Sequence, residues 1–164
     1  MEQEKTTQVK TSPKDVFLHL LAIITLYASA GSFIVLLFQY INILIPDLLD
    51  RSGYSGIESA YGTIRWSIAS LVVIFPVYIA TSWFLNKSYK TTPLKRNLKI
   101  RKWLIYFTLF VAALIIIGDL VALVFNLLGG ELTTRFLLKI LTIFFVAGSV
   151  FYYYFWDLRS HGTE

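Results

Sequence analysis

Four long apolar segments, separated by three short polar links, constrain this chain more than any other feature. A helix needs about 20 consecutive apolar residues to cross the hydrocarbon core of a bilayer. Each segment reaches that length: Val16–Ile45, Gly62–Leu85, Trp103–Leu128 and Phe136–Trp156. The sequence therefore predicts an all-α polytopic membrane protein, a four-transmembrane-helix antiparallel bundle.

The composition leaves no room for a separate soluble domain. Of the 164 residues, 56% are hydrophobic, against about 45–50% in ordinary soluble domains, and the excess lies in the four segments. We predict a disordered polar tail over 1–11, one transmembrane domain over 12–159, and a short tail over 160–164. Its helices are expected at about 14–46, 57–86, 93–128 and 132–157.

Two sites carry the residues that typically begin a helix. Ser12 can cap free N–H groups, Pro13 suits the first helical position, and Asp15 can close a capping box. Thr92 followed by Pro93 offers the same start for the third helix. We predict that both helices begin at these prolines.

Glycine and proline predict one turn and one kink. Gly129-Gly130 is expected to form a tight turn that forces the last two helices into an antiparallel hairpin. Pro76 lies inside the second apolar segment, where neighbouring helices can satisfy the carbonyl that it frees. We therefore expect a kink there and not a break.

The distribution of Lys and Arg predicts the orientation of the helices. Cytoplasmic links of membrane proteins are enriched in these residues. Eleven of them lie on one side of the predicted membrane: Lys5, Lys10, Lys14, Lys87, Lys90, Lys95, Arg96, Lys99, Arg101, Lys102 and Arg159. We predict that both termini are cytoplasmic.

Two opposite charges fall inside the predicted membrane. Folding the hairpin about Gly129-Gly130 brings Asp119 to the depth of Lys139. An isolated charge there costs at least about 2.5–3.5 kcal/mol, so the two should find each other. The pair is interpreted either as a structural ion pair that fixes helix register or as part of a proton or ion relay, and the structural interpretation is favoured.

These two residues belong to a candidate intramembrane polar cluster. Glu131, Arg135 and Lys139 are spaced by four and share a helix face, and Arg65 and Asp119 lie at the same side of the membrane. One interpretation is ordinary packing, in which polar groups bond across helices. The other is a polar cavity that opens to the outer side.

No catalytic, cofactor-binding or metal-binding residue is predicted. The sequence contains no phosphate-binding loop, no G-x-S-x-G and no H-E-x-x-H, and it has no cysteine. His19 is the only histidine near the membrane, and membrane haem generally needs two axial ligands. We therefore expect no enzymatic activity and no cofactor, and interpret His19 as structural.

The expected partners are membrane components. The bilayer itself is one, and the basic 87–102 segment could attract anionic lipid headgroups at about 1 kcal/mol per charge, although topology alone explains its charges. A second copy of the chain or another membrane protein is the further expected partner. Nucleic acid is not expected.

Several motifs resemble a mainly bacterial family of four-helix integral membrane proteins, catalogued only as a domain of unknown function. They are Ser12-Pro13-x-Asp15-Val16-Phe17, Ile64-Arg65-Trp66, Phe75-Pro76-Val77, Ile117-Gly118-Asp119-Leu120, Gly130-Glu131-Leu132-Thr133-x-Arg135-Phe136 and Tyr153-Tyr154-x-x-Asp157-Leu158-Arg159. The resemblance covers about residues 12–159. It implies a four-helix, multi-pass membrane domain in the bacterial plasma membrane, and it supplies no activity.

Three functions remain open at this point. The leading hypothesis is a non-enzymatic membrane protein that acts through helix–helix contacts as a structural or accessory component. The alternative is a transport-related protein that moves a proton, an ion or a small anion through an outward-facing cluster around Asp119 and Lys139. The third is a redox subunit that handles a quinone or a lipid.

Overall fold

Four long α-helices and one short 3₁₀ helix make up the computed structural model, which describes residues 11–45, 53–130 and 132–161. The order is α1 (Pro13–Leu44), α2 (Gly53–Thr91), η1 (Pro93–Asn97), α3 (Lys99–Gly129) and α4 (Thr134–His161). The predicted fold class and helix number are confirmed. α2 begins and ends several residues beyond its predicted bounds.

All four helices are long and apolar enough to cross a membrane, with mean hydropathy between 1.9 and 2.7 over their most apolar stretches. Most of their large apolar side chains lie on the surface, including Val72, Phe125 and Phe145, which are between 67% and 75% exposed. Such a surface suits lipid as the solvent, because hydrocarbon does not penalise exposed apolar groups.

α1 begins as predicted. Pro13 occupies the first turn, and the Ser12 hydroxyl accepts a hydrogen bond from the backbone N–H of Lys14 at 3.3 Å. The carboxylate of Asp15 instead forms an ion pair with Lys95 at 3.2 Å. Asp15 thus fastens the start of α1 to η1.

The link between α2 and α3 differs from the prediction that α3 begins at Pro93. Pro93 begins η1, the Thr92 side chain makes no capping hydrogen bond, and α3 begins at Lys99. Between the two helices, Leu98 has an extended backbone and is only 4% exposed. The non-helical backbone of Leu98 therefore separates η1, which carries Lys95 to Asp15, from α3.

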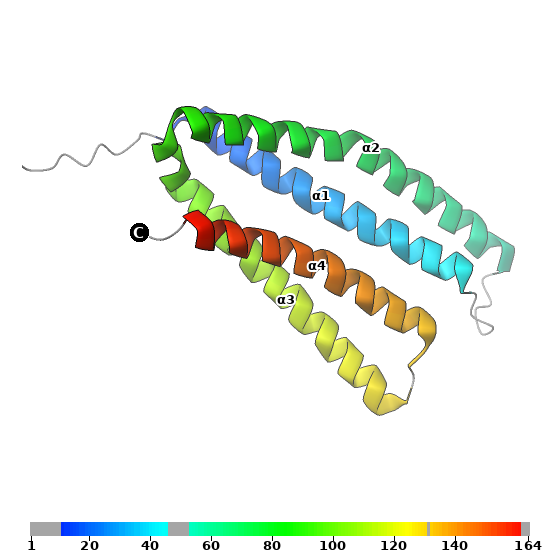
Figure 1. Ribbon diagram of the computed structural model, residues 1–164. Helices are drawn as coiled ribbons and strands as arrows, with labels where there is room; N and C mark the ends of the chain where they lie inside the picture. Colours follow the sequence, from blue (N-terminus) through cyan, green and yellow to red (C-terminus); the bar gives the residue numbers. More distant parts are fainter. Residues whose placement is uncertain (1–10, 46–52, 131, 162–164) are drawn as a thin grey trace, which may run out of the picture.

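The predicted glycine turn after α3 is confirmed at Gly130. This glycine has a φ of +71°, in the left-handed region that side chains with a Cβ rarely adopt. Its N–H donates to the carbonyls of Asn126 and Leu127, which closes the last turn of α3. At the other predicted irregularity, Pro76, α2 remains one continuous helix (Figure 1).

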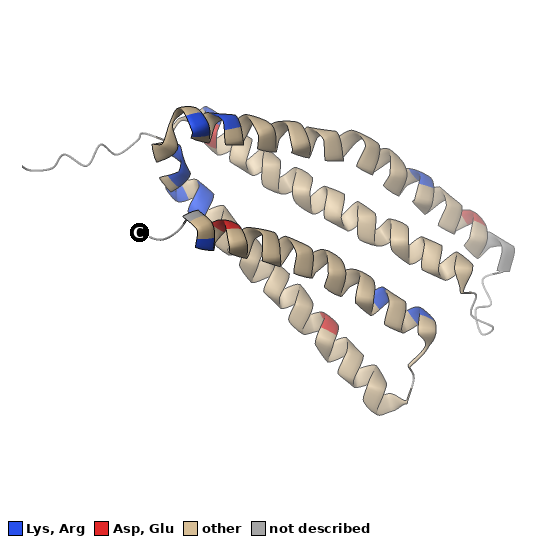
Figure 2. Cartoon of the chain, viewed as in Figure 1, with Lys and Arg blue, Asp and Glu red and all other residues tan. Residues whose placement is uncertain are grey.

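The helices form two hairpins, α1–α2 and α3–α4, which meet mainly where α1 lies beside α4 (Figure 1). They converge where α1 and α3 begin and α2 and α4 end. We call this the basic end, because Lys and Arg gather there (Figure 2). Toward the opposite end α3 diverges from α1 and α2. Within the described ranges, the backbone of α2 approaches neither α3 nor α4.

Polar side chains connect the hairpins near the middle of α1. The Tyr27 hydroxyl on α1 donates to the Thr108 hydroxyl on α3 at 3.0 Å. Thr108 in turn donates to the carbonyl of Leu104 within α3, and its side chain is only 1% exposed. Hydrogen bonds of this kind hold helices together in lipid, where the hydrophobic effect between helices is absent.

Candidate functional site

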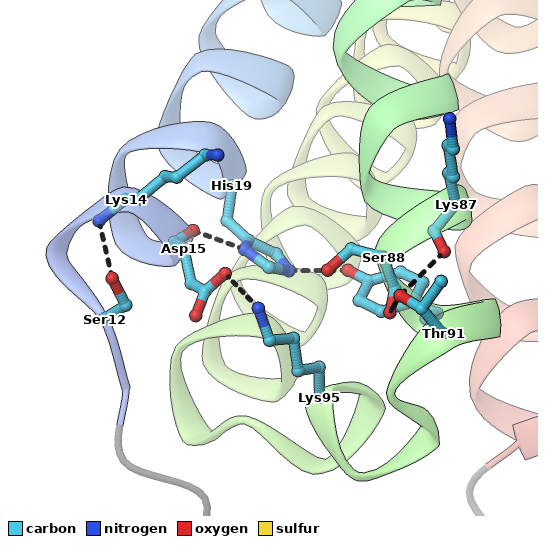
Figure 3. Close-up of polar contacts among 9 residues, drawn as sticks. Ser12, Lys14, Asp15, His19, Lys87, Ser88, Thr91 and Lys95 are labelled. Atoms are coloured by element: carbon cyan, nitrogen blue, oxygen red, sulfur yellow. Dashed lines mark hydrogen bonds and ion pairs between the residues drawn. The ribbon is translucent and has the colours of Figure 1, made fainter.

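The described polar side chains converge most densely at the basic end. His19 on α1 lies between the Asp15 carbonyl, 2.6 Å from its Nδ1, and the Tyr89 hydroxyl on α2, 2.6 Å from its Nε2 (Figure 3). A carbonyl oxygen only accepts, so Nδ1 carries the hydrogen, and Nε2 of the neutral ring accepts from Tyr89. Both ring nitrogens of the buried His19 are therefore used in joining α1 to α2.

Arg101 occupies the centre of this region. Its Nη2 lies 2.5 Å from Oδ2 of Asp157, so the pair joins the start of α3 to the end of α4. Its Nη1 donates to the carbonyl of Arg96 at 3.1 Å, and the guanidinium lies 5.2 Å from the centroid of the Tyr89 ring. The Arg96 guanidinium also lies near this ring, at 5.8 Å. Cation–π contacts thus add to the ion pair.

A small cavity of about 80 Å³ lies between these groups, and all four helices line it. Its walls carry His19, Arg101 and Asp157 together with the side chains of Tyr78, Asn86, Tyr153 and Tyr154. The hydroxyl and amide groups supply hydrogen-bond donors. We call His19, Tyr89, Arg101, Asp157 and this cavity the basic-end site.

The residues of this site were not predicted as a site. From the sequence, Asp15 was interpreted as part of a helix cap and His19 as a structural residue. Arg101 was interpreted as one of the cations that set the membrane topology. A usable signal was nevertheless present, because Asp15 and Asp157 are acids placed within helix ends that are otherwise rich in Lys and Arg. Acids in such positions are expected to pair with particular cations.

The predicted ion pair between Asp119 and Lys139 is absent from the described structure. Lys139 directs its ammonium group toward the Phe38 ring on α1, 5.5 Å from the ring centroid. Asp119 is only 6% exposed, and its Oδ2 has no hydrogen-bond partner. Equal depth did not produce contact because α4 also packs against α1, and Lys139 faces that neighbour.

Arg135 performs a role that the cluster interpretation did not anticipate. Its Nε donates to the carbonyl of Ile45 at 2.9 Å, and its Nη2 donates to the carbonyl of Asn42 at 3.0 Å. The last carbonyls of a helix lack intrahelical partners, and a cation beside them is favoured by the helix dipole. Arg135 at the start of α4 therefore caps the end of α1.

Of the two remaining members of the predicted cluster, the structure describes only Arg65. Arg65 lies on an exposed face of α2, away from α3 and α4. Glu131 lies outside the described residues. Within the described ranges, no three His, Asp or Glu side chains are grouped so that they could hold a metal ion.

The sequence matches the model of one known protein family. Residues 15–154 match the model of a family described as a domain of unknown function, DUF5671. The match covers well over half of the chain. The chain belongs to the DUF5671 family. The matched segment of this DUF5671 protein includes Asp15, His19, Tyr89 and Arg101 and ends three residues before Asp157.

The resemblance to a domain of unknown function is thus confirmed. Comparison of this DUF5671 protein with curated proteins and with solved structures gives no match. Its function must therefore be argued from its own residues.

Proposed function

We propose that this DUF5671 protein is a non-enzymatic integral membrane protein that acts through lateral contacts of α2 with another membrane helix. One observation carries the proposal: among the four long helices that the structure describes, the backbone of α2 packs closely only against α1, and it otherwise meets only the short η1 that follows it. α2, with 39 residues, is also the longest of the helices that the structure describes. Most of its circumference is therefore available to a helix of a second copy or of another membrane protein.

The surface of α2 suits such a contact. Gly62, Ala69 and Ala80 are exposed and lie seven and eleven positions apart, which places them on one helix face. A Cβ added at Gly62 would meet no atom within 4 Å. Small residues allow helix backbones to approach closely, and this close packing drives helix association in lipid. We call this the small-residue face of α2.

The charge pattern supports an orientation with both termini in the cytoplasm. Described carboxylates at the basic end, Asp15 and Asp157, form ion pairs with Lys95 and Arg101. Exposed cations remain on the surface there, among them Lys14, Lys87, Lys90, Lys99 and Arg159 (Figure 2). By the positive-inside rule this end faces the cytoplasm, and we extend the proposal to the plasma membrane of a bacterium.

Cysteine cross-linking tests the proposed contact without background, because the chain contains no cysteine. Ala69→Cys places a thiol on the small-residue face, while Ser67→Cys, at a side chain only 1% exposed, is the matched control. We expect oxidation in native membranes to link Ala69→Cys to a second copy or to one defined partner, and Ser67→Cys to remain monomeric. Equal, weak cross-linking of both variants would overturn the proposal.

Asp119 favours a second candidate function, proton or ion transport. A buried carboxylate in a membrane helix with an unpartnered oxygen is costly, and such residues typically mark ion pathways. The test is proton flux in liposomes that contain the purified protein. Transport requires that Asp119→Asn abolish the flux and that Asp119→Glu retain it. Equal flux in the wild type and Asp119→Asn would exclude this candidate.

A further inference from the structure

One carboxyl group lies on the packed face of α3, far from the basic end. Asp119 is only 6% exposed, whereas Ile117 and Val121, on either side of it, are 56% and 63% exposed. The buried residues Thr108, Ala112 and Asp119 follow one another at spacings of four and seven, so they share one helix face. The Asp119 side chain is therefore shielded by protein, while its neighbours in the sequence face lipid.

No described cation neutralises this carboxyl group. Its Oδ2 has no hydrogen-bond partner, and neither ion pair of the described structure includes it. On α4, Arg135 donates to carbonyl oxygens at the end of α1, and Lys139 lies over the ring of Phe38. α1 carries no Asp, Glu, Lys or Arg between residues 16 and 44, and the backbone of α2 does not approach α3 within the described ranges.

The depth of Asp119 makes an ionised carboxylate costly. It lies 17 residues after Lys102 at the basic end, about 26 Å along the helix, which is within a hydrocarbon core about 30 Å thick. The ten residues before it, 109–118, are all apolar or glycine. An unpaired charge at this depth is strongly disfavoured, whereas a neutral carboxylic acid avoids most of that cost. Binding of a cation is therefore what the carboxylate lacks.

A proton meets this need better than a metal ion does. A divalent metal ion takes about six to eight oxygen ligands. Within the described ranges, no three His, Asp or Glu side chains are grouped to supply them. A proton needs only one oxygen, and Oδ2 of Asp119 is buried and unused.

Uncharged polar side chains continue from Asp119 toward the end of the molecule opposite the basic end. Asn126 lies seven residues further on the same face of α3, and its amide donates to the carbonyl of Ala122 at 2.9 Å. Asn42, near the end of α1, has a buried Oδ1 without a hydrogen-bond partner in the described structure. In the other direction the chain offers the apolar residues 109–118. Access for a proton is thus easier from the end opposite the basic end.

We propose that Asp119 is a proton-binding site, a carboxylic acid that exchanges its proton with the side of the membrane opposite the basic end. The inference rests on the second candidate function, for which it names the proton as the bound ion. It is nevertheless distinct from transport, because a site can bind a proton without moving it across the membrane.

A hydrophobic carbodiimide reports a carboxylic acid inside a membrane. The carboxyl oxygen bonds to the central carbon of dicyclohexylcarbodiimide, and the carboxyl proton passes to one nitrogen. The acyl group then moves from oxygen to the other nitrogen and leaves a stable N-acylurea. Nothing is released, so the labelled peptide gains the mass of one carbodiimide molecule. An ionised carboxylate has no proton to give and reacts poorly.

The test uses the full chain in lipid nanodiscs, with labelled peptides located by mass spectrometry. Asp15 and Asp157 are internal controls, because both are ion-paired at the basic end. We expect Asp119 to be labelled at least about tenfold more than either, because a paired carboxylate holds its charge and carries no proton. Asp119→Asn should lose this label and Asp119→Glu should keep it. Equal labelling of the three carboxyl groups, or none at Asp119, would overturn the proposal.

Sodium chloride distinguishes a proton from a metal ion. We expect labelling of Asp119 to be the same in sodium chloride and in N-methylglucamine chloride of equal ionic strength. Protection by Na⁺ would show that a metal ion occupies the site and would overturn the assignment to a proton.

Sealed vesicles in which the basic end faces inward test the direction of exchange. Raising the outer pH alone should reduce labelling of Asp119, and raising the inner pH alone should not. The reverse dependence would overturn the proposed side of access. Labelling of Asp119 in a protein that shows no proton flux would uphold the proton-binding site and remove the transport candidate. Proton flux without labelling of Asp119 would overturn this inference and leave the transport candidate in place.

Discussion

The ion pair between Arg101 and Asp157 allows a quantitative test of how the basic end is held together. Asp157→Asn keeps the size of the side chain and removes its charge. The Nη2–Oδ2 distance is 2.5 Å, and the two side chains are 11% and 24% exposed. A hydrogen bond between charged groups contributes about 1.5–3 kcal/mol, and loss of one partner from a fully buried pair costs about 3–5 kcal/mol.

The expected loss in the free energy of unfolding of Asp157→Asn lies between these limits. Arg101 keeps the carbonyl of Arg96 and the ring of Tyr89 as partners, and Asp157 is partly exposed, so we expect a loss of about 2–3 kcal/mol. For a chain of this size, about 1 kcal/mol corresponds to about 2–4 °C in Tm. We therefore expect Asp157→Asn to lower the Tm by about 5–10 °C.

Circular dichroism of the protein in nanodiscs of fixed lipid composition measures this change. Arg159→Gln is the control, because it removes an exposed charge two residues away on the same helix. Combining Asp157→Asn with Arg101→Gln should cost much less than the sum of the two single losses, because both remove the same interaction. An unchanged Tm in Asp157→Asn, or strictly additive losses, would refute the reasoning.

Three further predictions concern the opposite half of the molecule. Asp119→Asn should leave the Tm in nanodiscs unchanged or raise it, because Asp119 forms no ion pair among the described residues and burial of its charge is costly. Arg135→Gln should lower the free energy of unfolding by about 1–3 kcal/mol, because it weakens the cap on the carbonyls of Asn42 and Ile45. Gly130→Ala should lower the free energy of unfolding by about 1–2 kcal/mol, because the φ of Gly130 is +71°. Gly129→Ala should instead raise it by about 0.5–1 kcal/mol, because Gly129 lies within the helix and faces open space.

Each of these three has an outcome that contradicts it. A clearly lower Tm in Asp119→Asn would show that the carboxylate has a partner in the membrane. An Arg135→Gln variant as stable as the wild type would show that water or lipid replaces the cap. Equal effects of alanine at positions 129 and 130 in urea unfolding would remove the argument from backbone conformation.

Patterns within one helix predicted much of the fold. Runs of apolar residues predicted the four helices. Ser12 and Pro13 predicted the start of α1, and the glycine pair predicted the turn before α4. Each of these features depends on neighbours in the sequence, so composition and spacing were sufficient.

Contacts between helices were harder to predict, because depth in the membrane does not determine the direction in which a side chain points. Asp119 and Lys139 were correctly placed on adjacent helices, but a rotation of about 100° per residue turns a side chain from one neighbour to another. Lys139 faces α1, and Oδ2 of Asp119 has no hydrogen-bond partner in the part of the chain that the structure describes. The contacts of His19 with Tyr89 and of Asp15 with Lys95 join residues 70 and 80 positions apart, beyond any local pattern.

The arrangement as two hairpins has a consequence for the order in which the protein assembles. His19–Tyr89 lies within the first hairpin, whereas the hydrogen bonds between the α1 segment and the second hairpin join residues 81 to 93 positions apart, from Tyr27–Thr108 to Arg135–Asn42. From the end of α2 at Thr91 to the end of α4 at His161, 70 further residues are synthesised, which takes about 3.5–14 s at ~5–20 residues per second. During those seconds the first hairpin stands alone in the bilayer, so it has to persist on its own contacts until the second hairpin arrives.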